Sequence, residues 1–248
     1  MKRIKLIIEY DGTQYVGWQS QKNGRSIQFE IEESIRELFN EPIKIYVAGR
    51  TDAGVHALGQ VAHFDINKIS IDQKKIFHAI NFFLKKNNNK ITILDSEIVE
   101  KSFHARFSAK KKFYLYKILN RTTQSFLSEN RSWFIPQKID LELMQKASKF
   151  FIGKHDFNAF RSVDCQSRVS VRTIDDIEIK RSNHFIDVRI CAKAFMHNQV
   201  RIMVGTLVNV GKKVFQYTDI PKILDSKQRK NAGPTAPSEG LYLEKIIY

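Results

Sequence analysis

Arg50, Asp52 and His56 place three side chains with chemical potential within seven residues of each other, in the stretch GRTDAGVHALGQVAHFD at positions 49–65. A carboxylate can act as a nucleophile at an anomeric sugar carbon, or as a base, without any cofactor. Aspartate is also a common turn residue that only caps the backbone of a loop. The stretch alone therefore leaves a catalytic and a purely structural interpretation open.

The elements around this stretch predict a loop held between two strands. Apolar and polar residues alternate over 43–47 and 61–65, which is typical of half-buried strands. Glycines at 49, 54 and 59 suit a loop that needs positive φ angles or a close approach to another molecule. Catalytic groups often lie on loops carried by rigid strands. We therefore expect residues 49–59 to form a functional loop.

The order of expected elements is strand, helix, strand, strand, helix, strand, and it occurs twice. The first set covers 4–8, 26–39, 43–47, 61–65, 72–84 and 90–99, and the second covers 113–119, 141–151, 171–179, 185–191, 198–210 and 241–247. This order is typical of ferredoxin-like βαββαβ units. We expect an α+β protein in which two such halves join into one extended, mostly antiparallel sheet, with helices on one face and a central cleft. The expected domains are 1–105, which carries the loop, and 106–248, with an insertion at 211–240 that ends in extended loop over 231–240.

Charge indicates a polyanionic partner. The 248 residues carry a formal charge of +15, from 41 Lys and Arg against 26 Asp and Glu. A surface merely solvated by lysines is the alternative. Basic residues gather next to the rings of Phe113, Tyr114 and Tyr116, namely Arg106, Lys110, Lys111, Lys112 and Lys117. Cations interleaved with rings suit single-stranded or splayed-out nucleic acid, whereas an ordinary strand would put the same rings into the core.

The sequence lacks the motifs of several common cofactor and metal sites. It contains no GxxxxGK[ST], GxGxxG, HExxH or zinc-deaminase pattern, and its seven histidines and two cysteines show no metal-ligand spacing. We therefore expect neither a cofactor nor a metal. The apolar run near the N-terminus is broken by Glu9, so we expect no signal peptide and no membrane span, and a cytoplasmic location.

Seven ordered blocks give the chain an end-to-end resemblance to the tRNA pseudouridine synthase A family. They are YDGTQYVGWQSQ, GRTDAGVHALGQVAHFD, FHARFSA, YLYKILN, GKHDFNAF, FMHNQVRIMVGTLVNVGK and APSEGLYL. The resemblance implies conversion of uridine to its C-glycoside isomer at positions 38 to 40 of the tRNA anticodon stem-loop, without cofactor, by a homodimer. A related enzyme acting on another tRNA or small-RNA uridine, and a non-catalytic RNA-binding folding helper, remain alternatives.

The resemblance also implies roles for single residues. Asp52 resembles the catalytic aspartate, and Arg201 the arginine that pairs with it and keeps it charged. Arg50 resembles the arginine that displaces the target nucleotide, and Tyr114 the ring that stacks on the target base. Leu241 and Leu243 would form an apolar wall beneath that base. We expect His56, Arg106, Lys110, Lys111 and Lys112 to contact RNA. The chain departs from common family residues at Lys22, Phe29, Lys85 and Ser170.

Overall fold

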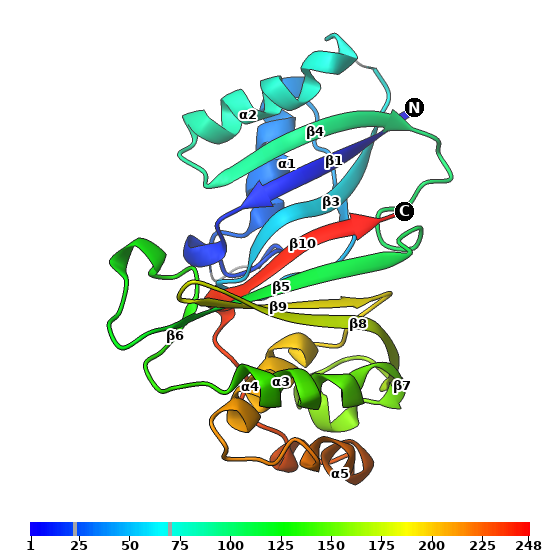
Figure 1. Ribbon diagram of the computed structural model, residues 1–248. Coiled ribbons are helices and arrows are strands. Elements are labelled where there is room, and N and C mark those ends of the chain that lie inside the picture. Colours follow the sequence, from blue (N-terminus) through cyan, green and yellow to red (C-terminus); the bar gives the residue numbers. More distant parts are fainter. Residues whose placement is uncertain (22–23, 69–70) are drawn as a thin grey trace. The chain divides into compact units, whose positions relative to one another are not determined.

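The computed structural model describes residues 1–21, 24–68 and 71–248, so Lys22 lies outside the described residues. Its chain packs into two compact units, whose elements are labelled in Figure 1. The first unit consists of Met1–Lys110 and Tyr242–Tyr248, and the second of Lys111–Leu241. The expected domains 1–105 and 106–248 stay a prediction, because packing alone does not test whether either part folds by itself.

The first unit has a sheet built around β1 (Lys2–Tyr10). This strand pairs antiparallel with β3 (His56–Ile66) on one side and with β4 (Ile91–Val99) on the other. The far edge of β3 is shared by β2 (Tyr46–Val47), which is antiparallel to it, and by β10 (Leu241–Ile247), which is parallel to it. With the helices α1 (Ile27–Phe39) and α2 (Ile76–Lys86), this is the predicted βαββαβ order.

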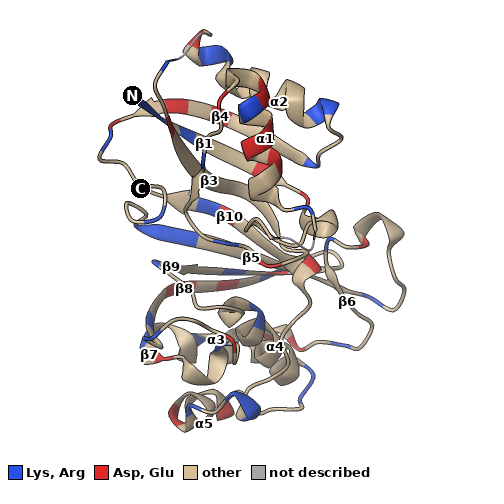
Figure 2. Cartoon of the chain, turned by 180° about the vertical axis from the view of Figure 1, so that it is seen from behind, with Lys and Arg blue, Asp and Glu red and all other residues tan. Residues whose placement is uncertain are grey.

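Apolar periodicity explains why these elements form. Ile4, Leu6 and Ile8 of β1 are fully buried and alternate with less buried residues. Helix α1 begins where the Ser26 hydroxyl accepts a hydrogen bond from the Phe29 amide at 3.3 Å, and its apolar stripe is buried. Figure 2, drawn from behind, shows α1 and α2 in front of the sheet, with acidic residues gathered on α1. The core of this unit therefore lies between the two helices and one face of the sheet.

The second unit has the strand order β5-β9-β8-β7, with antiparallel pairing throughout. These strands are β5 (Lys111–Asn120), β7 (Gly153–Asp156), β8 (Val171–Ser182) and β9 (Phe185–Ala192), and a short β6 (Trp133–Ile135) adds in parallel to the end of β5. The helices are α3 (Leu141–Ser148), α4 (Gln199–Gly211) and α5 (Asp219–Ser226). The predicted α+β class with mostly antiparallel pairing is confirmed. The joining of the two sheets and the central cleft stay predictions.

Helix α4 is buried on nearly all sides rather than along one stripe. Its Gly205 lies against the backbone of Pro234, where an added Cβ would be 1.9 Å from the carbonyl oxygen. The Thr206 hydroxyl accepts a hydrogen bond from the Gly233 amide at 2.9 Å. The segment 231–240, expected to be extended loop, therefore packs on α4 through Gly233 and Pro234. The 3-10 turns Arg229–Asn231 and Ser238–Gly240 lie at its two ends, so it is not extended throughout.

Several expected elements differ in extent. The strand expected over 43–47 is reduced to Tyr46–Val47, although Ile43 and Ile45 are buried, and β3 begins at His56, so Gly59 lies within a strand. The helices expected over 72–84 and 141–151 contain 3-10 turns at Gln73–Lys75 and Lys149–Phe151. The insertion contains a helix, α5, that periodicity did not predict. Phe29 lies exposed on α1. Lys85 lies in the last turn of α2, where lysine continues the helix and a proline would disrupt it.

No helix within the described ranges is both long and apolar enough to span a membrane.

Candidate functional site

Arg50 and Asp52 lie in the Asp52 turn, residues 48–55, which connects β2 to β3. The Val55 amide donates to the Asp52 carbonyl at 3.2 Å, and Gly54 has a φ of +76°, which L-residues rarely adopt. Arg50 is exposed and Asp52 is half-buried. The turn thus carries a cation and a carboxylate two residues apart, close to solvent.

Buried polar groups of the strands hold this turn. The Tyr10 hydroxyl lies 2.7 Å from the Thr51 hydroxyl, and the Gln60 side-chain amide donates to the Gly49 carbonyl at 2.7 Å. Tyr10 is 3% exposed, and burial raises its pKa to about 12, so the phenol stays protonated and can hydrogen-bond as a neutral group. The residue just before Asp52 is therefore fixed from within the protein core.

Gly17 and Trp18, in the described part of segment 11–25, pack against the turn from another direction. The Trp18 amide donates to the Thr51 carbonyl at 2.9 Å. Gly17 has a φ of +108°, and a Cβ there would lie 2.7 Å from the same carbonyl oxygen. Trp18 itself is buried and lies with its ring 6.1 Å from that of Tyr10. The close approach at Gly17 explains why this part of the segment requires glycine.

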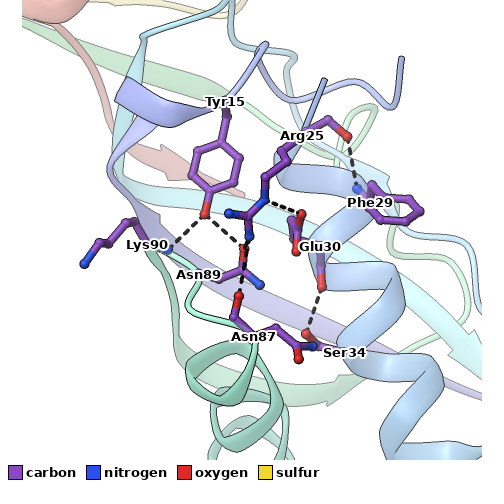
Figure 3. Close-up of polar contacts among 9 residues, drawn as sticks. Tyr15, Arg25, Phe29, Glu30, Ser34, Asn87, Asn89 and Lys90 are labelled. Atoms are coloured by element: carbon purple, nitrogen blue, oxygen red, sulfur yellow. Dashed lines mark hydrogen bonds and ion pairs between the residues drawn. The ribbon is translucent and has the colours of Figure 1, made fainter. Parts of the chain in front are cut away.

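A polar cluster around Arg25 holds the end of this segment, as Figure 3 shows. The Arg25 guanidinium donates to Glu30 at 2.9 Å and to the Asn89 side-chain oxygen at 2.8 Å. The Tyr15 hydroxyl also donates to Asn89, at 3.1 Å, and accepts from the Lys90 amide at 2.9 Å. These contacts tie Tyr15 and Arg25 to α1 and to the turn between α2 and β4.

His56 belongs to this supporting structure rather than to an exposed loop. It is 2% exposed, starts β3, and stacks on Tyr242 of β10 with the ring centroids 4.7 Å apart. Its Nδ1 accepts a hydrogen bond from the Gly12 amide at 3.1 Å. The same nitrogen lies 3.3 Å from a carboxylate oxygen of Asp11. Burial leaves the expected RNA contact of His56 a prediction.

Leu241 and Leu243 are both buried, and Leu243 pairs with Ala57 in the register between β10 and β3. This places Leu243 one residue along the sheet from the pair formed by His56 and Tyr242. The structure shows it as an apolar residue of the sheet that follows the turn. Its role beneath a base stays a prediction.

Tyr114 and Arg201 belong to the second unit. Tyr114 lies half-buried on β5, with its ring edge-on to Phe195 at 5.2 Å between centroids. Arg201 lies in the first turn of α4, where its Nε donates to the Ala236 carbonyl at 2.7 Å and its Nη1 donates to the Asn198 side chain at 2.9 Å. Two hydrogen bonds from different nitrogens fix the plane of the guanidinium.

The segment that receives the Arg201 bond is itself anchored. Arg229 donates to the Gly233 carbonyl at 2.9 Å and to the Thr235 hydroxyl at 3.1 Å. The Tyr116 hydroxyl donates to the Pro237 carbonyl at 2.7 Å, and burial raises the pKa of Tyr116 well above its usual range. The Ala236 oxygen is thereby held in place for Arg201.

The expected RNA-binding cations differ in exposure. Arg106 and Lys110 are exposed, and Lys111 is exposed but lies 3.5 Å from Asp175. Lys112 is only 9% exposed, so the structure does not place it on the surface with its neighbours. Figure 2 shows basic residues on β5. The RNA contacts of all four stay predictions.

The residues that hold the site were missed by sequence reasoning. Tyr10 ends an apolar strand without any visible partner, and Gln60 was not singled out at all. One signal was available, because a glutamine within the apolar run of β3 must satisfy its buried amide. Among the residues that the structure describes, no group of His, Cys, Asp and Glu has an arrangement able to hold a metal ion.

Comparisons with known proteins find one family model that matches most of the chain and relatives that match nearly all of it. A family model described as tRNA pseudouridine synthase matches residues 6–108 and 147–248. A relative named tRNA pseudouridine synthase A from Anaplasma phagocytophilum is 45% identical over 99% of this chain and 100% of its own length. Relatives of the same name from Ehrlichia canis and Wolbachia pipientis are 47% and 46% identical with the same coverage.

Proposed function

The chain belongs to the tRNA pseudouridine synthase family, and from that premise we propose that it isomerises uridine to pseudouridine at positions 38 to 40 of the tRNA anticodon stem-loop. The observation that carries the proposal is the similarity over the full chain to relatives named tRNA pseudouridine synthase A. An acidic residue on a turn anchored by buried groups supports it.

The reaction defines what the residues must do. The N1–C1′ bond breaks, the base turns within the site, and a C5–C1′ bond forms; C5 loses its hydrogen as a proton and N1 gains one, so product and substrate are isomers. The base cannot remain stacked in the RNA, and flipping it out costs a few kcal/mol. We assign the stacking that offsets this cost to Tyr114, the displacement of the nucleotide to Arg50, and the apolar wall to Leu241 and Leu243.

Asp52 is the proposed catalytic carboxylate, and Arg201 is its proposed partner. A guanidinium beside a carboxylate favours the charged form, which either a nucleophile or a base requires. The two bonds that fix the Arg201 guanidinium support this assignment, because a preorganised cation needs no reorientation during the reaction. No cofactor is required by this chemistry.

The net charge of +15 supports tRNA as the polyanionic substrate. We further propose a homodimer in which the basic surfaces of two copies form one longer track for a single tRNA. A cytoplasmic location follows from the proposed substrate, since tRNA is modified where it is made and used.

The decisive experiment measures release of the C5 hydrogen from isotopically labelled uridine in tRNA. The wild type should release the label, and Asp52→Asn should not, because the amide can serve neither as a nucleophile nor as a base. Asp95→Asn is the matched control, since Asp95 is an exposed aspartate on β4 and should keep full activity. Equal release by Asp52→Asn and wild type would refute the assigned catalytic role.

Mapping pseudouridine in RNA from cells with and without the protein tests which uridines are the substrates. Loss of the modification at positions 38 to 40 supports the proposal, whereas an unchanged anticodon arm with losses elsewhere indicates a synthase for another uridine. A folding helper would behave differently again. Its cellular function would survive Asp52→Asn but not charge reversal at Lys110 and Lys111.

A further inference from the structure

An aromatic cluster lies on the surface of the first unit, separate from the Asp52 turn. It consists of Tyr46 of β2 and of His104 and Phe107, which lie in the loop that follows β4, coloured green in Figure 1. The His104 ring lies 4.4 Å from that of Phe107 and 6.0 Å from that of Tyr46, centroid to centroid. Phe107 is 74% exposed and Tyr46 is 45% exposed. Large apolar rings are therefore presented to solvent side by side.

The backbone that presents Phe107 is firmly held. The His104 amide donates to the Ser108 hydroxyl at 2.9 Å, and the Ser108 amide donates back to the His104 carbonyl at 2.9 Å. The Arg106 amide donates to Nδ1 of His104 at 3.1 Å. These hydrogen bonds hold the turn, so the exposure of Phe107 does not result from a loose loop.

Buried groups support the same turn from below. The Ala105 amide donates to Nδ1 of the buried His63 at 3.2 Å, and the Ala105 carbonyl accepts from the Tyr248 hydroxyl at 2.7 Å. His63 also stacks on the inner side of Tyr46, with the centroids 5.2 Å apart. The rings of the cluster are thus positioned before any ligand arrives, which reduces the entropy lost on binding.

The charges around the cluster select the kind of partner. The guanidinium of Arg106 lies over the Phe107 ring at 5.6 Å, and the ammonium of Lys44 lies over the Tyr46 ring at 6.0 Å. Because Nδ1 of His104 accepts a hydrogen bond, this ring is neutral, and burial together with Arg3 and Arg106 lowers its pKa. Neutral rings flanked by cations match a nucleic-acid strand, whose bases stack on the rings while its phosphates meet the cations.

We propose that Phe107, with Tyr46 and His104, is a stacking platform for an unpaired base of the tRNA, distinct from the base that undergoes reaction. The identity of its ligand, tRNA, rests on the proposed function. The platform gives the tRNA a second point of attachment, besides the base that reacts. Arg106 contacts the phosphate next to the stacked base.

The test measures binding of an unmodified tRNA transcript by the full chain, at several salt concentrations. Phe107→Ala should raise the Kd by about fivefold or more, because stacking on an aromatic side chain is typically worth that factor or more per base. Its salt dependence should keep the wild-type slope, since stacking releases no counterions. Arg106→Gln should instead reduce the slope of log K against log salt by about 0.7, the value for one phosphate contact on a single strand.

A matched control is Phe82→Ala. Phe82 is 65% exposed on α2, with its ring edge-on to Phe83 at 5.3 Å, so it resembles Phe107 in exposure and ring contact without belonging to the cluster. It should leave the Kd unchanged. Phe107→Trp should retain binding. Its indole emission, taken as the difference from the wild type with Trp18 and Trp133, should be quenched when tRNA is added.

Two results would overturn the platform. One is a Kd for Phe107→Ala equal to that of Phe82→Ala. The other is a change in oligomeric state of Phe107→Ala in light scattering, which would make the cluster a contact between copies of the chain. If the platform proposal is wrong, the wild-type protein still converts uridine to pseudouridine in tRNA. If the proposed function is wrong, the wild-type protein does not, so the two failures are distinguishable.

Discussion

Tyr10→Phe tests whether the buried network positions the Asp52 turn. The change deletes a hydroxyl that lies 2.7 Å from the Thr51 hydroxyl and leaves the latter buried without this partner. Losing one neutral hydrogen bond and stranding a buried hydroxyl costs about 2 kcal/mol in the free energy of unfolding. Gln60 adds little, because it lies 3.5 Å from the Tyr10 hydroxyl and keeps its shorter bond to Gly49.

The effect on catalysis should exceed the effect on binding. Tyr10 is too deeply buried to touch RNA, so the Kd for tRNA should stay within about twofold of the wild type. The residue after Thr51 is Asp52, the proposed catalytic carboxylate, and a misplacement of a catalytic group by about 1 Å can cost about 100-fold in rate. We expect the single-turnover rate of labelled hydrogen release to fall about 10-fold or more at 25 °C, where a loss of about 2 kcal/mol leaves a protein of ordinary stability folded.

Tyr15→Phe is the matched control. It also removes a largely buried tyrosine hydroxyl with two hydrogen bonds, but its partners Asn89 and Lys90 lie between α2 and β4 rather than in the Asp52 turn. It should lower stability without a comparable loss of rate. A Tyr10→Phe enzyme that is destabilised yet reacts as fast as Tyr15→Phe would refute the reasoning.

A double-mutant cycle isolates the interaction itself. Thr51→Val is nearly isosteric and removes the other partner, so adding it to Tyr10→Phe leaves two apolar groups facing each other. The double variant should recover about 1 kcal/mol relative to the sum of the single changes. Strict additivity in chemical denaturation would mean that the two hydroxyls do not interact.

Two further predictions concern stability. Burial lowers the pKa of His63 to about 4, so below pH 6.5 the unfolded chain binds a proton that the folded one does not. The free energy of unfolding should therefore fall by about 2 kcal/mol between pH 6.5 and 4, a window that His63→Asn should remove in urea titrations. Gly205→Ala should destabilise by more than about 2 kcal/mol because its Cβ meets the Pro234 backbone, whereas Gly211→Ala meets only the side chains of Ile139 and Met144 and should cost clearly less in thermal unfolding. Equal losses for the two glycines would contradict the clash at Gly205.

Much of the fold follows from local patterns. The alternation in β1, the Ser26 cap and apolar stripe of α1, and the paired strands β8 and β9 were all predictable, because each depends on residues close together in sequence. The candidate chemical groups Arg50 and Asp52 were also visible, since they share one short turn. The residue types therefore determine which chemistry is available.

Tertiary structure decided how those groups are held. Thr51 is fixed by Tyr10, 41 positions away, and Arg201 by Ala236, 35 positions away, and no periodicity reports on such pairs. His56 and Lys112 look like surface residues in the sequence, but the folded chain buries both. Burial and hydrogen bonding depend on which distant segments meet, and this is why the sequence could predict candidate reacting groups while only the folded chain showed what supports them.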